Sequence, residues 1–200
     1  MLNFLTTPRP RIMPVPLAPP AEEPVTFDQA RIWLRADNAA EDDLVSTLAV
    51  AARMIVEAET GRRLVSQAWR LVMDAWAAGD TLIVPLTPLM SVDAIRVFDA
   101  ASVPQVIASE TYLVDKASDP GRIAFLTPPP APGRTISGIE IDITCGFGVD
   151  ASSVPPPLRQ AILLLIARWY DQRNDRDLRI DKGVPPEVTS LIAPYRLRRL

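Results

Sequence analysis

The spacing of hydrophobic positions changes twice along the chain, from a helical period to an alternating one and back. Between residues 26 and 61, apolar side chains recur every three or four positions, which is typical of amphipathic helices. From residue 64 to 146 the period is two, which indicates β-strands, and from residue 155 to 194 helical spacing returns. The pattern predicts an α+β protein with an antiparallel β-region inserted between N-terminal and C-terminal helices.

Two helices are predicted before residue 62. Thr26 and Gln29 have the spacing of a capping box, so a short helix is expected from there to about Arg35. A longer helix follows the looser capping pattern Asn38–Glu41, and Gly61 stands where a left-handed C-cap is preferred. Its apolar stripe has the helical period of a face that packs on a core, and comprises Leu44, Leu48, Ala51, Ala52, Ile55 and Ala58 or Glu59.

Residues 1–25 are predicted to form an extended arm. Seven prolines fall between positions 8 and 24. Proline fixes φ and removes a backbone donor, which favours polyproline II structure over a helix or the interior of a sheet. Both a disordered tail and an arm lying over a neighbouring subunit remain open, and residues 26–200 are interpreted as a single domain. The arm has apolar side chains that it could bury, namely Ile12, Met13, Val15 and Leu17.

Short segments of alternating apolar and polar residues fill the middle of the chain, and Pro, Gly, Asp or Ser residues separate them. Alternation is clearest in the last, where Ile139, Ile141, Ile143 and Cys145 share one face. We predict five or six antiparallel strands within the segments Leu64–Asp74, Asp80–Leu86, Val92–Asp99, Thr111–Asp115, Gly121–Leu126 and Gly138–Cys145.

A strongly apolar helix is predicted after Pro155–Pro157, since prolines suit the first turn of a helix, where a missing amide costs nothing. Residues on most sides of this helix are apolar, so it should pack against more than one neighbour. A last short helix starts at Val184–Glu187 and runs to Ala193, where Pro194 ends or kinks it. One side of the longer helix carries Leu158, Ala161, Ile162, Leu165, Trp169 and Arg173.

Composition narrows the class of protein. The chain has 200 residues with 48% hydrophobic and 22% charged side chains, as an ordinary globular protein has. Its single cysteine excludes an internal disulfide and is interpreted as a buried, inert thiol. No apolar run is long enough to cross a bilayer and no signal peptide is evident, so we expect production in the cytoplasm without membrane association.

Charge is distributed unevenly. Residues 158–200 carry nine basic and five acidic side chains, whereas residues 1–157 carry twelve basic and nineteen acidic ones. This polarity suits a molecule whose two ends face different partners. It does not identify nucleic acid as one of them, because aspartates interrupt the arginines between residues 168 and 182.

Candidate catalytic chemistry is scarce. The chain has no histidine, which removes Ser-His-Asp and Cys-His sites, and it has no phosphate-binding glycine loop or zinc spacing. The acids Glu41–Asp43 are better explained by a helix N-terminus than by a cation site. We therefore predict no enzyme activity and no catalytic, metal-binding or cofactor-binding residue. A carboxylate-dependent hydrolase and a small DNA-binding packaging protein stay as alternatives.

A family resemblance rests on four motifs in order. The segment Val154–Arg173, with Val184–Val188 and Leu191–Arg196 after it, resembles the head–tail connector (adaptor) proteins of tailed phages. The likeness is to the long form found in prophages and gene transfer agents of alphaproteobacteria. Two N-terminal segments are also similar to the first two helices of that family. The first is Thr26–Arg35, followed by the acidic residues Glu41–Asp43, and the second is Ala51–Arg62, in which Gly61 ends the helix.

This resemblance implies a structural role. Adaptors of this kind form a helical bundle, here with an inserted β-region. They assemble as a ring, expected to be twelvefold, in the neck of the virion or gene transfer agent particle after synthesis in the host bacterial cytoplasm. The ring binds the portal protein on one side and a stopper or tail protein on the other, and it extends the DNA channel, which implies non-specific proximity to transiting DNA. Another neck protein, a stopper or tail terminator, is the alternative, although those are mainly β-barrels.

Two groups of residues are predicted to carry that role. The first belongs to the apolar helix and provides core and inter-subunit contacts: Ile162, Leu165, Ile166, Trp169 and Tyr170. The second is the basic tail, which either frays or docks into the portal through backbone hydrogen bonds and Arg–carboxylate pairs: Tyr195, Arg196, Leu197, Arg198, Arg199 and Leu200.

Overall fold

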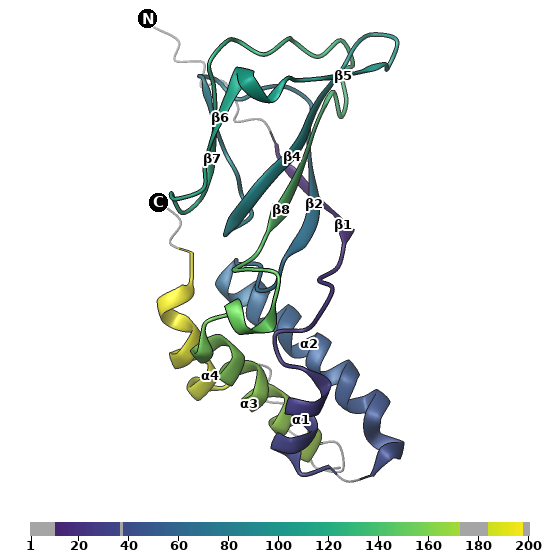
Figure 1. Cartoon of the computed structure of the whole chain (residues 1–200), viewed down its shortest axis with the longest axis vertical. Coiled ribbons are helices and arrows are strands. Elements are labelled where there is room, and N and C mark those ends of the chain that lie inside the picture. The colour runs from purple at the N-terminus through teal and green to yellow at the C-terminus, as the bar shows by residue number, and fades with distance from the viewer. Residues whose placement is uncertain (1–10, 37, 173–183, 198–200) are drawn as a thin grey trace, which may run out of the picture. The chain divides into compact units, whose positions relative to one another are not determined.

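The computed structural model of the chain describes residues 11–36, 38–172 and 184–197. The chain divides into two compact units, and Figure 1 labels their helices and all strands except β3. The β unit comprises the described residues up to Pro19 together with Gln67–Cys145. The helical unit comprises Pro20–Ser66 together with the described residues from Gly146 onward. Helices and antiparallel strands are both present, which confirms the α+β class.

Four helices and their connections enclose the core of the helical unit. Their order is α1 (Phe27–Leu34), α2 (Asp42–Thr60), α3 (Pro156–Gln172) and α4 (Pro186–Ile192). α3 packs against each of the other three helices. The fully buried side chains of this core include Val56, Leu64, Leu158, Ile162, Leu165, Ile166, Val188 and Ile192.

The ends of the helices follow the predicted signals. The Thr26 hydroxyl accepts a hydrogen bond from the Gln29 N–H, and the Gln29 side chain accepts one from the Thr26 N–H, so the capping box is confirmed. Gly61 ends α2 with a φ of 73°, the left-handed conformation that glycine adopts without a Cβ clash. A 3₁₀ turn over Ala193–Tyr195 follows α4 and contains Pro194, as predicted.

The buried face of α2 is not the apolar stripe that the sequence indicates. Of that stripe only Ala52 is buried, while Ile55 is exposed. The reason is that Val45, Ala49 and Val56 form the side of α2 that packs on the core. The paired residues Arg53 and Glu57 lie on that same side and are buried with it. The buried residues of α2 are Val45, Ala49, Ala52, Arg53, Val56, Glu57 and Thr60.

The β unit contains two antiparallel sheets. The larger has the strand order β1–β2–β8–β4–β5, and the smaller has the order β3–β7–β6. The strands are β1 (Met13–Ala18), β2 (Gln67–Met73), β3 (Thr81–Ile83), β4 (Leu89–Phe98), β5 (Pro104–Val106), β6 (Tyr112–Asp115), β7 (Arg122–Phe125) and β8 (Ile139–Cys145).

The predicted inward face of β8 is confirmed. Ile139, Ile141, Ile143 and Cys145 are all fully buried, in a core that β2, β4 and the smaller sheet share. The Cys145 thiol lies 3.7 Å from the Leu86 carbonyl oxygen and forms no disulfide. β8 occupies the centre of the larger sheet, between β2 and β4, which explains why its alternation is the clearest.

Two strands were not predicted. β5 has three residues and begins with Pro104, too short to give an alternating pattern. β1 lies within the proline-rich arm, whose composition indicates polyproline II structure. β1 pairs only with β2 and forms an edge of the sheet. An edge tolerates Pro14 and Pro16, since residues whose N–H would point away from the sheet need no donor.

Candidate interaction surfaces

The predicted residues of the long apolar helix lie on α3. Ile162, Leu165 and Ile166 are buried in the core of the helical unit. Trp169 and Tyr170 are partly buried and pack against the same core, and the Tyr170 hydroxyl donates a hydrogen bond to the Glu41 carboxylate. All five side chains therefore contact their own subunit, the last two with part of their surface left open.

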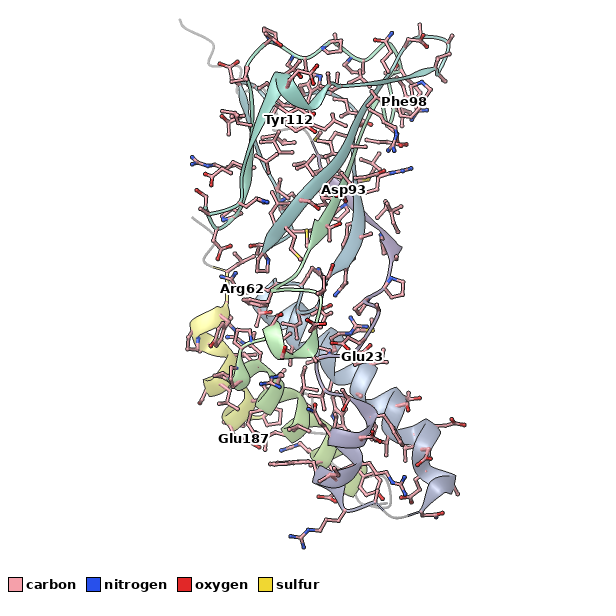
Figure 2. The ribbon with its side chains drawn as sticks, viewed as in Figure 1. Glu23, Arg62, Asp93, Phe98, Tyr112 and Glu187 are labelled. Atoms are coloured by element: carbon pink, nitrogen blue, oxygen red, sulfur yellow. The ribbon has the colours of Figure 1, made fainter. Side chains whose placement is uncertain are left out.

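The basic tail begins from a fixed position at the end of α2. Arg62, labelled in Figure 2, donates from Nε to the Tyr195 carbonyl oxygen at 2.6 Å. The Leu197 N–H donates to the Thr60 carbonyl oxygen at 2.9 Å, and Arg196 pairs with Glu59 at 2.6 Å. The remaining predicted tail residues, Arg198, Arg199 and Leu200, lie outside the described residues.

A buried carboxylate holds the α2 end in place. Glu57 is only 2% exposed and accepts hydrogen bonds from Arg53 at 3.1 Å, from Arg63 at 3.2 Å and from the Leu64 N–H at 3.0 Å. Arg53 also donates to Glu23, which precedes α1, at 2.7 Å (Figure 2). Burying these charges is costly unless each is paired, so removal of one partner destabilises strongly.

Sequence reasoning missed this network. Arg53 and Glu57 are four residues apart in a helix, a spacing that lets them touch. The same spacing is common in exposed pairs, so it does not signal burial.

The α2 outer face is apolar, and the described residues of the subunit leave much of it exposed. Met54 is 58% exposed, and Val50 and Ile55 are each 38% exposed. This face of α2 points away from the core because the buried residues lie on the opposite side of the helix. We define the α2 outer face as Leu44, Val50, Ala51, Met54, Ile55 and Ala58.

A groove lies between α1 and α3 and is the second uncovered apolar surface. It has a volume of about 400 Å³. Ile32 is 77% exposed and Trp33 is 44% exposed along its α1 side. The Arg159 Nε is buried and finds no hydrogen-bond partner among the described residues. This α1–α3 groove is lined by Val25, Gln29, Ile32, Trp33, Pro156, Arg159, Gln160 and Leu163.

The β unit carries a cluster of ion pairs on the outward side of its larger sheet. Asp142 of β8 accepts from Arg70 of β2 at 2.7 Å and from Arg96 of β4 at 2.6 Å, and Arg70 also contacts Glu140 at 3.1 Å. Partial burial alone would raise the pKa of Asp142, but the hydrogen bonds and charges of the two arginines outweigh it and lower that pKa. The Asp142 hydrogen bond correspondingly raises the pKa of Arg70, against the opposing effect of burial.

These surfaces are suited to packing and to ion pairing. Over the described ranges, no group of three or more His, Cys, Asp or Glu residues could hold a metal ion. None of the helices in those ranges is long and apolar enough to span a membrane.

Comparison with known proteins gives matches among solved structures. A chain from the neck of an empty GTA particle, computed with C6 symmetry, is 33% identical with a TM-score of 0.77; the match covers 94% of this chain and 97% of that one. A chain from the virion of a native gene transfer agent (GTA) particle is 32% identical with a TM-score of 0.77, and the match covers 94% of this chain and 97% of that one. A third chain, from the neck of a native GTA particle computed with C12 symmetry, is 33% identical with a TM-score of 0.69. That match covers 95% of this chain and 97% of the other. No family model and no curated protein matches the sequence.

Proposed function

The chain belongs to the neck proteins of gene transfer agent particles, and from this premise we propose that it is the head–tail adaptor of such a neck. In this role it forms a ring between the portal protein and the stopper or tail, and extends the channel through which DNA passes. The observation that carries the proposal is that the likeness to neck chains runs over nearly the whole of both chains, so both units have counterparts.

The proposed ring is closed and contains twelve copies of this chain. The symmetry of the matched necks supports a cyclic arrangement. Within each copy, the helical unit serves as the adaptor bundle, since α3 packs against all three other helices and has apolar residues on most sides. Permanent interfaces are more hydrophobic than transient ones, which fits the apolar surface left on this unit.

The portal contact is proposed to lie in the basic tail. The Tyr195 carbonyl oxygen accepts from the Arg62 side chain and the Leu197 N–H donates to the Thr60 carbonyl oxygen, so the residues after them start from a defined place. Three arginines between positions 196 and 199 suit carboxylates on a partner protein. The stopper or tail then binds on the opposite side of the ring.

The proposed role is structural, without catalysis. Its nearest rival is another neck role, that of a stopper or tail terminator. Both assignments predict particles without infectious or transferring function when the gene is absent, so the position of the defect has to be resolved by imaging.

Electron microscopy of particles from a strain lacking this gene tests the proposal. An adaptor is required after packaging, so we expect DNA-filled heads without tails and without density below the portal. Heads that retain a ring below the portal would instead assign a later neck role. Empty heads would assign a packaging role and contradict the proposal. Restoration by the wild-type gene on a plasmid is the control.

A further inference from the structure

Two apolar surfaces of the helical unit are left uncovered by its own core: the α2 outer face and the α1–α3 groove. We propose that, in the neck ring, the α2 outer face of one subunit docks into the α1–α3 groove of the next copy of this chain. This inference rests on the proposed function and specifies the contact by which the ring closes.

The α2 outer face has the pattern of a packing surface, yet the part of its own subunit that the structure describes leaves it largely exposed. Apolar residues recur at helical spacing from Leu44 to Ala58, yet the side of α2 that enters the core is the one with Arg53 and Glu57. Single exposed apolar residues need no explanation, but a contiguous stripe marks an interaction site. Met54, the most exposed large side chain of the stripe, lies near its middle.

The α1–α3 groove has an apolar lining on both of its sides, as a receptor for a helix has. Ile32 and Trp33 form one side and Leu163 the other, and recognition of a helix through an apolar groove is a recurring mode of association. Arg159 belongs to the same lining, and its buried Nε has no hydrogen-bond partner in the described part of the chain.

A second copy of the chain is the occupant that these observations favour. A cyclic ring of more than two subunits requires a heterologous interface, in which two different surfaces of each subunit meet. The helical unit carries both such surfaces. The charges near them are also opposite: α2 begins with Asp42 and Asp43, whereas the charged residue in the groove lining is Arg159.

Cross-linking in assembled particles tests the contact directly. Met54→Cys and Ile32→Cys are introduced singly and together into the full-length chain, and purified particles are treated with a short bis-maleimide. The only native cysteine, Cys145, is buried, so it contributes little background. We expect a ladder of linked multimers from the double variant and monomers from each single variant. Dimers from either single variant would indicate a two-fold contact and overturn the proposal, as would an absence of multimers from the double variant.

A charge substitution gives a second, independent readout. Met54→Glu and Ile32→Glu place a charge in the proposed contact, and we expect each to reduce the yield of tailed particles at least tenfold. Val106→Glu is the matched control, because Val106 is also exposed, at 68%, but lies on β5. Melting temperatures close to that of the wild type would show that the variants fold. Normal assembly by Met54→Glu and Ile32→Glu would overturn the contact.

The two proposals fail in different ways. If the deletion strain lacks tails but the double cysteine variant gives no ladder, the neck role stands and the contact is wrong. If deletion leaves the tails in place, the adaptor role itself is wrong, whatever the cross-linking shows.

Discussion

The two long helices of the helical unit use their apolar residues in opposite ways. α3 buries its most apolar side in the core of its own subunit, with Ile162, Leu165 and Ile166 fully enclosed. α2 buries a side on which the charged pair Arg53 and Glu57 lies among small apolar residues, and it leaves its outer face largely exposed. A stripe of helical period therefore predicts a packing face, but it does not say whether the packing partner belongs to the same chain.

Removal of the buried carboxylate of α2 should have the largest effect on stability. Glu57→Ala leaves Arg53 buried without its helical partner, and we expect a loss of about 3–5 kcal/mol in the free energy of unfolding. Chemical denaturation followed by circular dichroism measures it. Glu59→Ala is the control, because Glu59 forms an exposed pair with Arg196 and should cost about 0–1 kcal/mol. Equal losses in both variants would contradict the buried role of Glu57.

Shortening a buried side chain of α3 should have the second-largest effect on stability. Leu165→Ala removes a fully buried side chain, and the lost transfer energy and cavity together should cost about 2–5 kcal/mol. Leu164, one residue earlier, is only partly buried, so Leu164→Ala should cost less. If the two substitutions cost the same, the orientation of α3 described above is wrong.

The β unit offers a pH-dependent contrast to the helical network. The pKa of Asp142 is lowered in the folded state, so its contribution to stability is complete above the ordinary carboxyl value of about 3.9 and is lost as the pH falls through the lowered folded value. We expect Asp142→Asn to lower the melting temperature at neutral pH and to flatten its fall below about pH 4. If the melting temperature of this variant falls with acid as that of the wild type does, Asp142 does not cause the loss of stability at low pH.

The smallest effect on stability is expected on the α2 outer face. Met54→Ala should change the free energy of unfolding of the isolated subunit by less than about 0.5 kcal/mol, because the side chain is largely in solvent there. Differential scanning calorimetry of the free protein checks this. A loss of several kcal/mol would mean that this face is part of the subunit core, and the contrast between α2 and α3 would collapse.

Local signals in the sequence predicted much of the fold correctly. The Thr26–Gln29 capping box, the Gly61 C-cap, the α3 helix and the inward face of β8 all depend on neighbours a few residues away. Helix caps and the alternation of side chains along a strand follow the same rules in any fold, so they can be predicted from the sequence alone.

The remaining features depend on contacts between distant segments. β1 forms because β2 accepts it at the sheet edge, although its prolines alone indicate polyproline II structure. The tail meets the end of α2 through Arg62 and Tyr195, which are 133 positions apart. The buried Arg53 donates a hydrogen bond to Glu23, which is thirty positions earlier in the sequence. No local pattern records these pairings.

Electron cryomicroscopy of the particle neck would show the proposed contact between subunits directly. We expect a closed ring below the portal in which the α2 outer face of each subunit lies against α1 and α3 of its neighbour, with Met54 near Ile32 and Trp33. A ring in which the α2 outer face is exposed to solvent, or is covered by a different protein, would contradict it.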